Sequence, residues 1–370
     1  MKKLAGVVYF DVFALMLLGL VLVMSASSTY SSVKFEDTFY LFNAHVTRIL
    51  IGILLMSLTA FLPFELYKDY SRIILIGSII LLAYTLAAAP SINGAGRWIN
   101  LGVVSFQPAD LARLALLIHL SNMLVEKKEM LSNYKHGFLK LFVWVGLVAV
   151  LILLQPNLSN AFLIVFLSLV LMFVGGAKLK HIAATTAPFI LLGGSAAMIY
   201  SHSRERILGF LTSLFQGGEV NHQVTQAMVG LGSGGFFGVG LGFSKQNNLF
   251  LPEAYGDFIF AILGEELGFL GAVLVLVAFL LFFIAGILIA KKATDPFAKL
   301  LAFGITISVI TYAFVNISVA SGVLPTTGLP LPFISYGGTS IFFTCISVGM
   351  LINIAISSSK EENPEEVEEE

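Results

Sequence analysis

Charged residues are scarce in this chain. Only 12% of its 370 residues are Asp, Glu, Lys or Arg, whereas 57% are hydrophobic. A soluble domain carries about twice that share of charge, so the composition indicates a protein that is solvated by lipid. The formal net charge is −1 and the basic residues form no stripe. We therefore expect no binding of nucleic acid.

Cysteine is almost absent as well. The single thiol, Cys345, lies in an apolar run. One cysteine excludes an intramolecular disulfide framework and a metal site built from clustered thiolates.

Long hydrophobic runs dominate what is present. A hydrocarbon core about 30 Å thick is crossed by roughly 20 helical residues, and about ten segments fit this length. The predicted spans are Val7–Met24, Arg48–Leu62, Arg72–Ala89, Pro108–Leu124, Phe138–Leu154, Asn160–Val174, Ile182–Tyr200, Leu267–Ala290, Ala298–Ala320 and Ser335–Ile356. The predicted fold class is all-α: a polytopic integral membrane protein with a large extracytoplasmic loop between the seventh and eighth helices. The first run lacks a cleavage site and is expected to remain as a helix.

Residues 1–357 are predicted to form one membrane domain, with residues 201–256 as the large outer loop and residues 358–370 as an acidic, disordered cytoplasmic tail. Residues 257–290 are too long for one span, so their first turns are expected to be a separate helical piece. If both termini are cytoplasmic, most of the 21 Lys and Arg fall on the inner side. The others are Lys34, Arg48, Arg97, Arg113, Arg204, Arg206 and Lys245. Several of these indicate an outward-facing site.

Asp110 and Arg113 are three residues apart in the fourth predicted span. This spacing predicts an ion pair on one helix face. Ionisable groups inside a membrane often mark a functional site, but a pair that only orients neighbouring helices is an equal alternative.

Asp257 stands where a polar loop meets an apolar helix. Burial would raise its pKa towards the range useful for a general base, and a nearby cation would lower it. The alternative is that Asp257 caps the following helix. Glu253, Glu265 and Glu266 carry the same ambiguity.

Two irregular stretches flank these helices. Residues 230–242 are glycine-rich and match a dinucleotide fingerprint once, but no strand–helix–strand unit is expected around them. Tight turns and close approach of the backbone to a ligand or to a neighbouring helix are the better interpretation. Pro325, Pro330 and Pro332 forbid a continuous helix. Such backbone should line a cavity, with a plain rigid loop as the alternative. We expect Ser335, in the same stretch, to contact substrate.

These segments, in this order on about ten spans, resemble the SEDS family of shape, elongation, division and sporulation proteins. The strongest likeness lies in LPEAYGDFIFAILGEELGF at 251–269 and LPTTGLPLPFISYGG at 324–338. Both resemble the division branch more than the elongation branch. Departures from the family pattern are Tyr255-Gly256 in place of His-Thr, Asn157 in place of aspartate, and Asn247 in place of lysine.

The resemblance implies a peptidoglycan glycosyltransferase that polymerises lipid II into β-1,4 glycan strands on the outer face of the bacterial cytoplasmic (inner) membrane, for division or elongation. Asp257 matches the family's essential acid and is the expected general base. The expected substrate-binding residues are Arg97, Asp110, Arg113, Arg204, Arg206, Gln223, Gln226, Lys245, Glu253 and Ser335. Among them, Arg97, Arg204, Arg206 and Lys245 are the candidates to stabilise the lipid pyrophosphate leaving group.

We expect a divalent cation, Mn²⁺ or Mg²⁺, to assist at the pyrophosphate, with its ligands unassigned, and no organic cofactor. The expected partners are lipid II, the nascent glycan strand, a class B penicillin-binding protein and other divisome or elongasome membrane proteins. Two other functions stay open. A flippase or transporter of the lipid-linked precursor would need polar lining through the whole membrane depth, and a non-enzymatic scaffold would not need Asp257.

Overall fold

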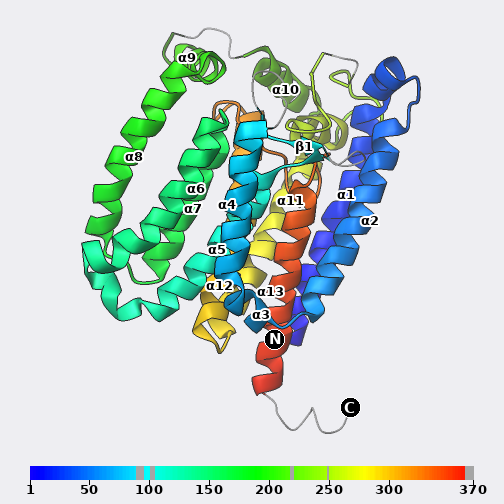
Figure 1. Cartoon of the computed structure of the whole chain (residues 1–370). Helices are drawn as coiled ribbons and strands as arrows, with labels where there is room; N and C mark the ends of the chain where they lie inside the picture. Colours follow the sequence, from blue (N-terminus) through cyan, green and yellow to red (C-terminus); the bar gives the residue numbers. More distant parts are fainter. Residues whose placement is uncertain (89–95, 101–104, 217–220, 248–249, 363–370) are drawn as a thin grey trace, which may run out of the picture.

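The computed structural model describes residues 1–88, 96–100, 105–216, 221–247 and 250–362. Long helices stand side by side in a bundle, with the N-terminus at one end and α9 and α10 at the other (Figure 1). The helices are α1 (Lys2–Phe35), α2 (Tyr40–Phe61), α3 (Phe64–Asp69), α4 (Ser71–Ala88), α5 (Pro108–Glu126), α6 (Leu139–Leu154), α7 (Leu158–Val174), α8 (Leu179–Ile199), α9 (Ser201–Gln216), α10 (His222–Ser233), α11 (Ile259–Lys292), α12 (Pro296–Ala320) and α13 (Ser340–Glu362). A 3₁₀ turn (η1, Lys128–Ser132) and a π turn (η2, Tyr134–Phe138) join α5 to α6.

Every predicted span coincides with a helix. In the part of the chain that the structure describes, 8 helices are long and apolar enough to cross a membrane, and α7 is a shorter apolar helix. The remaining predicted span, Ile182–Tyr200, is helical as α8. The chain is therefore a multi-pass, helical membrane protein.

The structure departs from the sequence prediction in three places. The predicted loop 201–256 contains α9 and α10, and its residues 217–220 and 248–249 lie outside the described residues. The predicted disordered tail begins as helix, because α13 continues to Glu362 with no proline before Pro364. Residues 363–370 lie outside the described part. A short antiparallel ribbon, β1 (Ile99–Asn100) with β2 (Ser105–Phe106), adds two strands to the helices.

The bundle has α5 at its centre. Of the most apolar window of α5, 83% is buried, compared with 28% for α2 and for α4. It packs against α4, α7 and α12, while α2 packs on α13 and α11 packs on both α1 and α12. Four polar residues on α5, Asp110, Arg113, His119 and Ser121, are thus enclosed by protein and kept from lipid.

The helix α11 is broken near its start. Gly268 has φ 68° and ψ −165°, which separates the piece Ile259–Leu267 from the long shaft that follows. This confirms the predicted separate helical piece. Residues with a side chain avoid that backbone conformation, so glycine is required.

The glycine-rich segment 234–242 supplies the hydrogen bonds that the break leaves open. The carbonyl oxygens of Glu265 and Glu266 accept from the N–H groups of Val239 (3.0 Å) and Gly240 (3.1 Å). The freed N–H of Phe269 donates to the Gly235 carbonyl at 2.9 Å. Within a membrane such groups must be paired inside the protein. The glycine run is therefore a packing element, as the sequence suggested.

The adjoining carboxylates are structural too. Glu265 accepts from the backbone N–H of Lys245 (3.0 Å) and of Gln246 (3.3 Å). Glu266 accepts from the N–H of Gly242 (3.1 Å) and from the Ser25 hydroxyl. Both side chains are buried, and they hold the segment that follows α10 against α1 and α11.

Gly238→Ala is expected to lower the free energy of unfolding by about 3 kcal/mol, because φ is +82° and a Cβ would overlap the carbonyl of Glu266. Gly232→Ala is the matched control, since nothing lies within 4 Å of its Cβ position and its φ is ordinary. Thermal unfolding in detergent measures both. Equal melting temperatures for the two variants would contradict this account of the break.

Candidate active site

Asp257 lies in the loop that precedes α11. Its carboxylate faces the backbone of Gly328, where a Cβ would sit 3.5 Å from Oδ2. Its own carbonyl oxygen accepts from Nδ2 of Asn316 at 2.8 Å. The same Nδ2 donates to the carbonyl of Leu329 at 2.8 Å, so one buried carboxamide on α12 joins two loops.

Further hydrogen bonds tie the loop before α11 to the proline-rich stretch. The Ser335 hydroxyl donates to the carbonyl of Gly256 (2.7 Å) and accepts from the N–H of Leu331 (2.8 Å). The N–H of Tyr336 donates to the carbonyl of Tyr255 at 2.9 Å. These bonds join segments 251–258 and 324–339. Ser335, predicted to contact substrate, makes bonds here that position the two segments.

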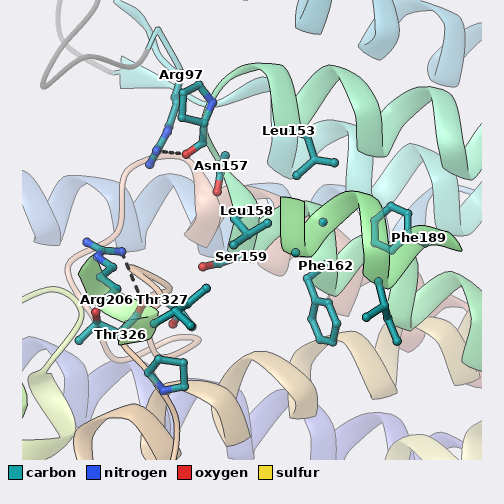
Figure 2. Close-up of a pocket in the computed structure, with 16 residues that line it drawn as sticks. Arg97, Leu153, Asn157, Leu158, Ser159, Phe162, Phe189, Arg206, Thr326 and Thr327 are labelled. Atoms are coloured by element: carbon teal, nitrogen blue, oxygen red, sulfur yellow. Dashed lines mark hydrogen bonds between the residues drawn. The ribbon is translucent and has the colours of Figure 1, made fainter. Parts of the chain in front are cut away.

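Arg206, on α9, is the cation whose charge acts on the carboxyl group of Asp257. Its guanidinium donates to the carbonyl of Thr326 at 3.5 Å (Figure 2). Burial and the charge of Glu253 raise the pKa of Asp257 and Arg206 lowers it, with a result of about 6. The carboxyl group is therefore mostly ionised at neutral pH, yet basic enough to accept a proton.

Arg97 is anchored from the other side, just before β1. Its guanidinium donates to the carbonyl of Gln155 at 3.0 Å and to that of Pro156, at the turn between α6 and α7. Burial lowers the pKa of Arg97, and so does the positive charge of Arg206. The two positive charges are close enough to repel each other, and this repulsion favours the binding of an anion between them.

A cavity of about 380 Å³ opens beside these arginines. In Figure 2 Arg97 and Arg206 lie at one end and Phe162 and Phe189 at the other. The lining residues are Arg97, Leu153, Pro156, Asn157, Leu158, Ser159, Phe162, Phe189, Ile190, Gly193, Gly194, Arg206, Ile207, Pro325, Thr326 and Thr327. Phe162 and Ile190 are 56% and 58% exposed, so this end opens on the flank of the bundle.

A small pocket leads from this cavity to the acid. It is lined by Arg206, Gln223, Asp257, Phe258, Val319, Thr326, Thr327, Gly328 and Leu329. Three of these residues, Arg206, Thr326 and Thr327, also line the large cavity. The arrangement joins an apolar trough, a pair of cations and one carboxylate of raised pKa. It suits a lipid with an anionic head and a proton to be removed.

Among the predicted site residues, Arg97, Arg206, Gln223 and Asp257 are brought together. Arg204 and Lys245 are exposed and line neither pocket, and Gln226 also lies outside both linings. Glu253 is exposed and acts on Asp257 through its charge alone.

The predicted ion pair in α5 is wrong. Asp110 and Arg113 are both buried, but their charged groups are not within 4 Å of each other. The Arg113 guanidinium lies 4.1 Å from the ring centre of Tyr312, a cation–π contact with α12. Neither residue lines the large cavity. Arg113 joins α5 to α12 through Tyr312, while the buried Oδ2 of Asp110 has no hydrogen-bond partner in the described structure.

Sequence reasoning missed Asn316. Its signal is a single carboxamide in the apolar run of α12, and polar groups inside a membrane helix usually serve a partner. Thr326 and Thr327 were noticed only as part of the proline-rich stretch, although both line the two pockets.

A model of the FTSW_RODA_SPOVE family, described as cell cycle proteins, matches residues 7–360. A protein of Geobacter sp. (strain M18) named probable peptidoglycan glycosyltransferase FtsW is 34% identical over 341 residues, which cover 91% of this chain and 92% of that protein. A protein of the same name from Escherichia coli O6:H1 is 37% identical over 351 residues, covering 92% and 83%.

Solved structures show the same fold. A chain of a peptidoglycan synthase complex, studied for the coordination of polymerisation and crosslinking, is 26% identical with a TM-score of 0.78, covering 95% of this chain and 97% of that one. The rod shape determining protein RodA of Thermus thermophilus is 25% identical with a TM-score of 0.68, covering 95% and 96%.

Asn316→Leu is expected to lower the free energy of unfolding by about 3 kcal/mol, because it leaves two backbone carbonyls without their donor. Amide hydrogen exchange should accelerate together in segments 251–258 and 324–339. Ser321→Ala is the control on the same helix, since its exposed hydroxyl only donates to Ile317 within α12. Unchanged exchange in both segments would show that Asn316 does not hold them.

Proposed function

The chain belongs to the FtsW, RodA and SpoVE family, and from this we propose that it is a peptidoglycan glycosyltransferase that polymerises lipid II on the outer face of a bacterial cytoplasmic membrane. The observation that carries the mechanism is the placing of Asp257 beside Arg206, at the end of a cavity with apolar walls. The reaction needs a base, cations for the leaving group and apolar walls for the lipid, and residues around these two pockets supply all three.

Asp257 serves as the general base. The donor sugar of lipid II is α-linked to its pyrophosphate and the glycan bond is β, so a single inverting displacement is required. That displacement needs one base, which takes the proton from the acceptor's 4-hydroxyl group. A pKa of about 6 leaves the carboxylate ionised at neutral pH and still able to accept this proton.

Arg206 and Arg97 stabilise the departing pyrophosphate. Negative charge grows on its oxygens as the glycosidic bond breaks, and fixed cations lower the energy of that state. Backbone carbonyls hold both guanidinium groups in place before substrate binds, so little reorganisation is needed.

The apolar part of the cavity takes the start of the lipid chain. Leu158, Phe162 and Phe189 line it beyond the arginines. A flippase would need polar lining through the whole depth, whereas these deeper walls are hydrocarbon. The geometry therefore favours catalysis at one face over transport.

The partner and the orientation complete the proposal. One similar solved chain belongs to a peptidoglycan synthase complex, which supports a penicillin-binding protein as the crosslinking partner, with other divisome or elongasome proteins and the glycan strand nearby. Lysines gather near Lys128, Lys178 and Lys291, at the end of the bundle opposite α9 and α10. By the positive-inside rule, this distribution supports cytoplasmic termini and an outer position for Asp257.

A divalent cation remains part of the proposal. The described residues contain no group of three or more His, Cys, Asp or Glu side chains that could hold one. A Mg²⁺ or Mn²⁺ ion would therefore be held chiefly by oxygens of the substrate's pyrophosphate, where it would neutralise charge.

Asp257→Asn should reduce polymerisation of lipid II by about 100-fold or more, measured as glycan chains formed by the purified protein with its partner. For the parent, the rate should fall about tenfold per pH unit below the pKa of about 6, because protonation removes the base.

Two variants test the sign of the electrostatics. Glu253→Gln removes a charge that raises the pKa of Asp257 and should move the acid limb of the profile to lower pH. Arg206→Gln should move it to higher pH and also slow the reaction. Full activity of Asp257→Asn, or a profile that is flat from pH 5 to pH 7, would remove Asp257 as the base. Absence of polymer from both the parent and the variant would favour the transporter or the scaffold.

Removal of divalent cations with a chelator is expected to slow polymerisation, and added Mn²⁺ or Mg²⁺ should restore it, because the pyrophosphate then regains its counter-charge. The initial rate at increasing chelator concentration measures this. An unchanged rate with chelator in excess would assign charge neutralisation to the arginines alone.

A further inference from the structure

A second cavity lies at the opposite end of the bundle. Its volume is about 510 Å³, and it opens where α5, α7 and α11 end and α12 begins. Figure 1 shows these helix ends on the side away from α9 and α10. The cavity is lined by Leu124, Val125, Lys128, Val174, Gly175, Ile287, Ala290, Lys291, Pro296, Lys299, Leu300 and Phe303. The proposed polymerisation uses none of these residues.

The charge in this cavity is of one sign. Lys128, Lys291 and Lys299 come from three different elements, and no acidic side chain lines the cavity. Within the described residues, no acidic group lies within 4 Å of these ammonium groups. A ligand with negative charge is therefore favoured.

Of the acids near the lysines in the sequence, Glu129 is exposed outside the cavity, and two others are engaged elsewhere. Asp295 caps α12 at the N–H of Ala298 (2.9 Å) and pairs with Lys68 at 3.9 Å. Glu126 accepts a hydrogen bond from Asn122 at 3.0 Å. The positive charge of the cavity is thus not cancelled from within.

The walls are hydrocarbon. Leu124, Val174, Ile287, Leu300 and Phe303 face the cavity below the lysines. A free anion would leave these walls uncovered, while a neutral or zwitterionic lipid would leave the lysines without a counter-charge. The matching ligand has acyl chains and a negative head, and it lies at the depth where helix ends meet lipid head groups.

We propose that this cavity is a binding site for an anionic phospholipid of the leaflet at the lysine-rich end. The three ammonium groups hold the phosphate, and the first part of the acyl chains covers the apolar walls. Since the site stands at the junction of α11 and α12, the lipid fills a gap between two helices whose far ends are near the candidate active site: Asp257 precedes α11, and α12 carries Asn316.

The test is a lipid titration of the purified protein in neutral detergent, followed by native mass spectrometry, with phosphatidylglycerol, phosphatidylethanolamine and inorganic phosphate as separate probes. Phosphatidylglycerol should bind the parent most tightly. Each single Lys→Gln change should weaken it about fivefold, and Lys128→Gln, Lys291→Gln and Lys299→Gln together roughly 100-fold.

The matched control is Lys135→Gln, Lys140→Gln and Lys180→Gln, which removes equal charge from the same end at exposed positions outside the cavity. Its affinity should stay within about twofold of the parent's. Val174→Trp keeps every lysine and places a large side chain in the cavity from an exposed position. It should therefore also weaken the binding of phosphatidylglycerol.

Four results would overturn the site. One is an equal loss in the control, another is phosphatidylethanolamine binding as tightly as phosphatidylglycerol, and the third is competition by inorganic phosphate at similar concentration. Undiminished affinity in Val174→Trp would also overturn it, and that variant decides the question even if the triple lysine variant does not fold.

Discussion

The carboxamide of Asn316 holds together the two irregular segments on which the site depends. Backbone that is not helical can persist inside a membrane bundle only when the protein itself supplies its hydrogen bonds. Asn316 and Ser335 supply them for segments 251–258 and 324–339, and the glycine-rich segment supplies them for the break at Gly268. The position of Asp257 therefore depends on the hydrogen bonds of Asn316, of Ser335 and of the glycine-rich segment together.

The electrostatics of the site follow from this frame. Burial and Glu253 push the pKa of Asp257 up, Arg206 pushes it down, and the balance near 6 suits a base at neutral pH. Arg97 and Arg206 approach each other because separate carbonyl groups anchor each of them. The folded protein thus holds two guanidinium groups that repel each other, and an anion bound between them would relieve the repulsion.

Much of the fold could be predicted from the sequence, because hydrocarbon imposes run lengths that are visible along the chain. The convergence of Arg97, Arg206, Gln223 and Asp257 could be predicted only through family resemblance. Spacing misled in α5, where Arg113 turns to Tyr312 on another helix instead of Asp110. Asn316 escaped notice because a lone polar residue does not reveal its partners, which depend on how distant segments pack.

The flank opening beside Phe162 and Ile190 determines how a lipid-bound sugar can reach the acid. Drawing a lipid chain out of hydrocarbon costs about 0.8 kcal/mol for each methylene group, a prohibitive sum for a long polyprenol. A side entrance removes that penalty, since the tail stays dissolved in the bilayer while only its head slides between the helices. Successive carriers can then arrive and depart by diffusion in two dimensions, without ever crossing water.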